Sequence, residues 1–152
     1  MEAAGCKILV VANETVQGRP LHEKVVELAG EGDCEVLLVC PALNSRIRHW
    51  FSDNDAARVA AEDRLESSLA ALSEAGLHAR GVVGDADPVQ AIADALRDFG
   101  ADQIVISTHP PDRSHWLEKG VVERARALGD LPVTHVVVDM TQESQVVDPP
   151  AA

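Results

Sequence analysis

The feature that most constrains this chain is a set of short apolar runs that show no alternation between apolar and polar residues. One covers residues 7–13, Lys-Ile-Leu-Val-Val-Ala-Asn, and another covers residues 35–40. Such runs are typical of strands that are covered on both faces, since alternation is expected only where one face meets water. We therefore expect a sheet with helices packed on both sides.

Amphipathic segments of helical length separate these runs. Residues 20–30 place apolar side chains at helical spacing and end at Gly30, and residues 53–75 form the longest predicted helix. A third helix is predicted after Asp87, whose carboxylate can cap free amides, with Pro88 at its first position. A fourth is predicted over residues 114–128.

Further strands are predicted at residues 78–83, 103–107 and 133–139. Strand and helix alternate along the whole chain, which indicates right-handed crossovers and a parallel sheet. The predicted fold class is therefore α/β: a single-domain, open, parallel five-stranded sheet with helices on both faces. The domain is expected to span residues 1–140, and the polar residues 141–152 are expected to form a flexible tail.

The charge of the chain limits its partners. Twenty-five acidic and 13 basic side chains give a formal net charge of −12. This charge repels phosphate backbones and anionic lipids, so neither nucleic acid nor a membrane is expected as a partner. No apolar run approaches the roughly 20 residues of a membrane span, and no signal peptide is visible at the N-terminus. A cytoplasmic location is therefore expected.

The three cysteines are Cys6, Cys34 and Cys40. Their number is odd and no C-x-x-C spacing occurs, so we expect reduced thiols, no disulfide and no zinc site. This expectation also favours a reducing compartment.

Ligands in open α/β sheets bind beyond the carboxyl ends of the strands, where the winding direction reverses. Polar residues that follow the first, second and fourth predicted strands are therefore candidates for ligand binding: Asn13, Arg46, Ser107, Thr108, His109, Arg113 and Ser114. Their donor groups, with a helix starting near Ser114, would suit a small anion. In the competing interpretation Ser114 only caps that helix and the arginines lie in solvent.

Catalytic interpretations have less support. His109, Asp112 and His115 are spaced three apart and could be drawn as metal ligands, but two prolines separate them and no fourth ligand is apparent. Ser107 and His109 could be drawn as nucleophile and base, yet the chain has neither a G-x-S-x-G nor a G-x-x-x-x-G-K motif. No catalytic or metal-binding residue is therefore assigned.

Several segments together resemble the universal stress protein family, over about residues 6–140. The matching segments are residues 8–12, 84–92, 101–105, 122–125 and 131–133. The resemblance implies the family's adenine nucleotide alpha-hydrolase-like fold, with strand order 3-2-1-4-5 and a switch point between strands one and four. It also implies dimers that pair through the last strand.

In nucleotide-binding members of this family, glycines after the fourth strand let backbone amides approach phosphates. Aligned through Glu123, the three glycine positions fall on Ile106, His109 and Lys119. The acidic residue that helps hold adenosine is replaced by Asn13. We therefore expect that the chain does not bind ATP in the usual family mode.

The leading hypothesis is a non-enzymatic, universal-stress-like regulatory or small-ligand-binding protein that acts in a stress response. The alternative is a divergent adenine-nucleotide-binding protein that uses the crevice between strands one and four. Residues 133–139 would leave an apolar sheet edge, which pairing with a second copy would cover, so a homodimer is expected. A metal-dependent hydrolase that uses His109, Asp112 and His115 is the third hypothesis.

Overall fold

The computed structural model describes residues 6–12, 14–30, 34–43, 53–85, 87–109, 120–139 and 144–148. Its strands are β1 (Cys6–Val11), β2 (Cys34–Leu43), β3 (His78–Asp85), β4 (Gln103–Thr108), β5 (Val133–Asp139) and β6 (Ser144–Asp148). Its helices are the 3-10 helix η1 (Glu14–Gln17) and the α-helices α1 (Arg19–Ala29), α2 (Asp53–Glu74), α3 (Pro88–Phe99) and α5 (Val121–Arg126).

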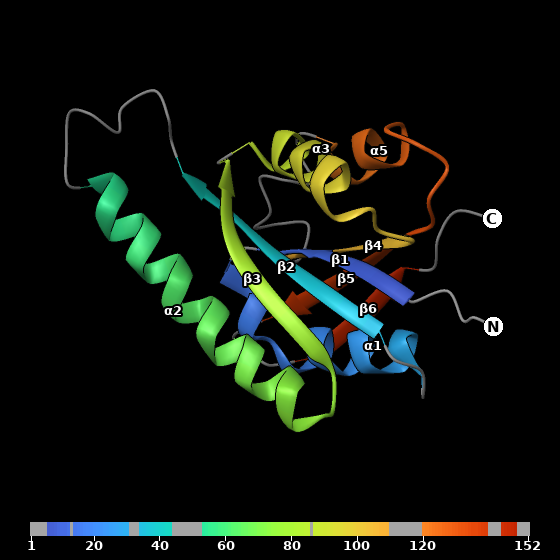
Figure 1. Cartoon of the computed structure of the whole chain (residues 1–152), viewed down its shortest axis with the longest axis horizontal. Coiled ribbons are helices and arrows are strands. Elements are labelled where there is room, and N and C mark those ends of the chain that lie inside the picture. The colour runs from blue at the N-terminus through green and yellow to red at the C-terminus, as the bar shows by residue number, and fades with distance from the viewer. Residues whose placement is uncertain are drawn as a thin grey trace.

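The strands form one sheet in the order β3-β2-β1-β4-β5-β6. The first five are parallel to their neighbours and β6 is antiparallel to β5. Helices α1 and α2 cover one face, and α3 and α5 cover the other (Figure 1). The predicted α/β fold, with five parallel strands in the order 3-2-1-4-5, is confirmed.

The central strand β1 explains the unbroken apolar run in the sequence. Ile8 and Val10 pack in the core beneath α1 and α2, whereas Leu9 and Val11 pack against α3 and its neighbours. All four side chains are fully buried. Because both faces of the strand are covered from Ile8 to Val11, each of these positions is apolar.

The predicted start of α3 is also confirmed. The Asp87 carboxylate accepts a hydrogen bond of 3.0 Å from the Val89 amide, and Pro88 occupies the first turn. The helix ends at Gly100, whose positive φ of 70° is a conformation that glycine adopts without strain. In the described part of the chain, no helix is long and apolar enough to cross a membrane.

The end of the chain differs from the prediction. Residues 144–148 form β6, which pairs with β5 from His135↔Asp148 to Asp139↔Ser144. The predicted tail therefore contains a strand, and β5 is not the last strand of the sheet. The physical reason is that an apolar strand edge needs a partner, and the chain supplies one itself.

The cysteines differ from the prediction as well. Cys6 and Cys34 are directly opposite each other in the parallel pairing of β1 and β2, with their Cα atoms 4.4 Å apart, and they form a disulfide. Cys40 is buried and free. The expectation of three reduced thiols is therefore wrong, because strand register rather than sequence spacing brings two of them together. The cysteines no longer favour a reducing compartment, since disulfides persist in oxidising ones.

The disulfide is expected to stabilise the fold by constraining the unfolded chain. Its sequence separation of 28 residues corresponds, in the loop-entropy model, to roughly 3–4 kcal/mol. Replacing Cys6 with Ser should lower the free energy of unfolding by an amount of this order in denaturant titrations without reductant.

Thiol counting supplies the control for this prediction. Of the three cysteines, only Cys40 should react with a thiol reagent in denaturant before reduction, and all three should react afterwards. Three reactive thiols in the unreduced protein would contradict the assignment of the bond.

Candidate functional site

The winding direction of the sheet reverses at β1, which has β2 on one side and β4 on the other. The carboxyl ends of β1 and β4 therefore form the edge where this fold class binds ligands. Of the residues predicted there, Ser107, Thr108 and His109 lie at the end of β4. The remaining predicted residues lie outside the described part of the chain: Asn13, Arg46, Arg113 and Ser114.

Ser107 hydrogen-bonds to another protein hydroxyl at this edge. Its Oγ donates to Thr15 Oγ1 over 2.7 Å, and both side chains are only 1% exposed. Thr15 belongs to η1, the short helix that follows β1, so the bond joins the ends of the two strands at the switch point. Sequence reasoning identified Ser107 but not Thr15.

Thr108 makes a second buried pair on the opposite face of the sheet. Its hydroxyl donates to the backbone carbonyl of His109 over 2.9 Å and lies 2.8 Å from Nε2 of His135. Because the hydroxyl proton points to the carbonyl, His135 donates through Nε2 to the Thr108 oxygen. His135 is buried on β5, and its only sequence signal is a polar residue within an apolar run.

His22 connects η1 to α2 and so helps to fix the position of η1. Its Nε2 lies 2.8 Å from the Val16 carbonyl in η1 and 2.7 Å from Oγ of Ser68 in α2. Burial lowers the pKa of His22, and the hydrogen bond to Val16 offsets this only partly. The ring is therefore neutral near pH 7. Sequence reasoning missed this residue, which sits beside the buried stripe formed by Leu21 and Val25.

These contacts occupy hydrogen-bonding groups of the predicted site residues in β4 and just after it. The hydroxyls of Ser107 and Thr108 bond to protein groups, and each is buried. His109 is half-buried and contributes its carbonyl to Thr108. In this arrangement the three residues hold the strand ends together, and their predicted role in binding an anion stays a prediction.

The thiol nearest this edge is Cys40 in β2. Nη2 of Arg64 lies 3.9 Å from its sulfur, but burial outweighs this charge and raises the pKa of Cys40. The thiol therefore stays protonated at neutral pH, unlike a nucleophilic cysteine.

The metal hypothesis can be tested only in part. Within the described ranges, no group of three or more His, Cys, Asp or Glu side chains could hold a metal ion. Asp112 and His115 lie outside those ranges, so their predicted cluster with His109 is neither formed nor excluded.

The sheet order and the position of the switch point define an open, doubly wound α/β protein. The sequence model of the universal stress protein family matches residues 6–136, which is most of the chain. The chain therefore belongs to the universal stress protein family.

Solved structures agree with this fold. Hypothetical protein MJ0577 superposes with a TM-score of 0.67 at 16% identity, covering 86% of this chain and 94% of that protein. A universal stress protein family member from Burkholderia pseudomallei gives a TM-score of 0.58 at 20% identity, with coverages of 85% and 93%. A family protein from Arabidopsis thaliana with AMP bound gives 0.60 at 15% identity, with coverages of 90% and 94%. None of the curated proteins compared with this chain matches it significantly.

The lowered pKa of His22 predicts how stability depends on pH. The unfolded chain binds this proton at about pH 6.5, whereas the folded chain binds it only at lower pH. Above pH 6.5 the contribution is fully present. Between 6.5 and the folded pKa, stability falls as pH falls, with a slope of at most about 1.4 kcal/mol per pH unit.

Thermal unfolding of the wild type and of a His22→Gln variant between pH 5 and 8 measures this effect. The variant should show a flatter profile below pH 6.5, while a His78→Gln control at an exposed position should follow the wild type. Identical profiles for wild type and His22→Gln would show that this ring does not titrate differently on folding.

Proposed function

We propose that this chain is a non-enzymatic regulatory or small-ligand-binding protein of the universal stress protein family that does not hold ATP in the usual family mode. The pairing of buried hydroxyls at the strand ends supports the part of this proposal that concerns ATP. Ser107 bonds to Thr15, and Thr108 bonds to the His109 carbonyl and to His135. A ligand that used these hydroxyls would have to break contacts between buried groups, which is costly.

The side chains at the aligned glycine positions also argue against the usual mode of ATP binding. Ile106 is fully buried in the core between β4 and the helices α3 and α5. A phosphate therefore cannot approach the backbone at this position as it would approach a glycine. His109 places a ring at the second position, and Lys119 lies outside the described residues.

The alternative function is adenine-nucleotide binding in the crevice between β1 and β4. It is favoured by one observation, the AMP bound to the Arabidopsis thaliana relative. A role in a stress response and a cytoplasmic location stay predictions. The net charge of −12 supports small molecules or proteins as partners rather than nucleic acid.

Thermal shift and calorimetry with AMP, ADP and ATP, with and without Mg²⁺, separate the two functions. A nucleotide at about 100 times its Kd would stabilise the fold by about 2.7 kcal/mol. That corresponds to a rise in Tm of roughly 5–10 °C for a chain of this size. We expect no measurable rise at millimolar nucleotide.

The Arabidopsis thaliana relative provides the positive control in the same buffers, because it has been solved with AMP bound. A saturable, stoichiometric heat of binding for ATP or AMP to the present chain would reject the proposed function in favour of the alternative.

We propose further that the expected homodimer forms through β5 only when β6 is displaced. The strand β5 is buried from Val133 to Val138, so removing β6 would leave an apolar edge that requires another partner. The covering strand has five residues against seven in β5 and pairs with it from His135 to Asp139.

Light scattering after size exclusion tests this proposal. The full chain should be monomeric at micromolar concentration, and a chain that ends at Met140 should be dimeric. A chain that ends at Asp148 keeps β6 and serves as the control, which should match the full chain. A truncated chain that stays monomeric and folded would contradict pairing through β5.

A further inference from the structure

A groove of about 280 Å³ lies between α3 and the β2–β3 edge of the sheet. It lies over β2 and β3, away from the crevice between β1 and β4, and contains none of the predicted site residues. The apolar part of its lining consists of Leu37, Val39, Val82, Ala91, Ala95 and Phe99, together with Gly84. Its volume is just below the range that is usual for small-molecule sites, about 300–1,000 Å³.

The groove exists because small residues face each other across it. A Cβ atom at Gly84 would come within 3.1 Å of Val39 Cγ1 and 3.2 Å of Ala91 Cβ, so glycine lets the start of α3 approach β3 closely. Ala95, one turn further along α3, has a short side chain on the same flank. Val82 is left 45% exposed at the sheet edge.

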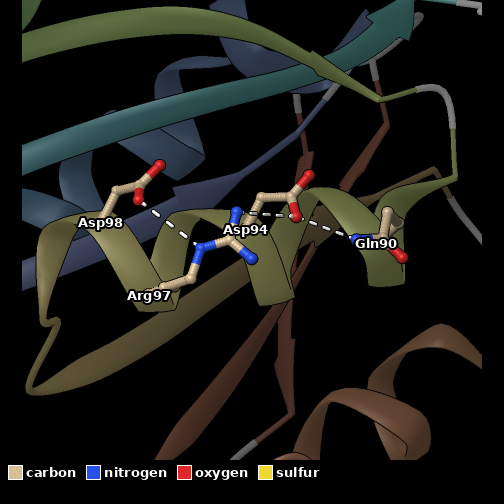
Figure 2. A network of polar contacts seen from close by, with 4 residues as sticks. All are labelled: Gln90, Asp94, Arg97 and Asp98. Carbon is tan, nitrogen blue, oxygen red and sulfur yellow. Dashed lines mark hydrogen bonds and ion pairs between the residues drawn. The ribbon is translucent and has the colours of Figure 1, made fainter.

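Two of the three charged residues in the lining are bonded to other side chains of α3. Arg97 lies between Asp94 and Asp98, with Nη2 3.5 Å from Asp94 Oδ1 and Nε 3.7 Å from Asp98 Oδ1 (Figure 2). Gln90 also donates to Asp94 Oδ1 over 2.8 Å. Arg97 thus compensates part of the negative charge on this flank, although such exposed pairs are individually weak.

The third charged residue, Arg80 on β3, has no such compensation. Its guanidinium lies over the Phe99 ring, 5.6 Å from the centroid, and Lys7 Nζ lies 5.4 Å from the same centroid. Among the residues that the structure describes, no carboxylate forms an ion pair with Arg80. Glu35 lies near the start of β2, opposite His78 on β3, and does not line the groove. The groove therefore combines an apolar floor with the guanidinium of Arg80 at one end.

We propose that this groove binds a small amphipathic anion, an aromatic or short aliphatic carboxylate. Its apolar body would lie on Val82, Ala91 and Ala95, and its carboxylate would pair with Arg80, whose planar guanidinium suits a bidentate contact. This site goes beyond the proposed function, because it shares no residue with the β1–β4 crevice and does not depend on whether that crevice binds a nucleotide.

Phenylbutyrate and phenylbutylamine test the proposal, since they carry similar apolar bodies and opposite charges. Each is titrated into the full-length protein while amide proton–nitrogen correlation spectra are recorded. Phenylbutyrate should shift the amides of Gly84, Ala91 and Ala95 saturably. The amine should bind about ten-fold more weakly or not at all, because it places a cation beside Arg80.

An Arg80→Gln variant should weaken phenylbutyrate binding about three- to ten-fold, as expected for loss of a partly exposed carboxylate pair. Arg124→Gln, the same change at an exposed position on α5, should leave binding unchanged. The spectra also report whether each variant is folded. The proposal is overturned by shifts that do not map to the groove, by an amine that binds as tightly as the acid, or by a folded Arg80→Gln variant that binds like the wild type.

Discussion

A buried hydroxyl needs a hydrogen-bond partner. In this chain, the buried hydroxyls of Ser107 and Thr108 find their partners in other protein groups, at the edge where this fold class binds ligands. The bond from Ser107 to Thr15 joins residues 92 positions apart and ties β4 to the segment that follows β1. His22 connects the same segment to α2. On the other face of the sheet, Thr108 connects β4 to His135 on β5. Together these polar contacts connect five elements of the fold: η1, α1, α2, β4 and β5.

Most of the fold could be predicted from the sequence, because its signals are local. Unbroken apolar runs indicated strands covered on both faces, and Asp87 with Pro88 indicated where α3 begins. The order of the strands was not a local signal, since any doubly wound arrangement satisfies the same periodicity. It came from the family resemblance, and the family and the sheet order are both confirmed.

What could not be predicted depends on pairing between distant segments. Cys6 meets Cys34 through strand register, and β6 covers β5 although its residues read as polar tail. His135 and His22 gained roles only once the helices and strands around them were in place. The groove beside α3 is of the same kind, because it arises where Gly84 on β3 meets Ala91 and Ala95 on α3, with Arg80 at one end.

The most direct test of this account is a double-mutant cycle on the bond between Ser107 and Thr15. Free energies of unfolding are measured for the wild type, Ser107→Ala, Thr15→Val and the double variant. A buried hydrogen bond predicts a coupling energy of about 1 kcal/mol between the two positions. Additive effects, with a coupling below about 0.3 kcal/mol, would show that these hydroxyls are not committed to each other and remain available to a ligand.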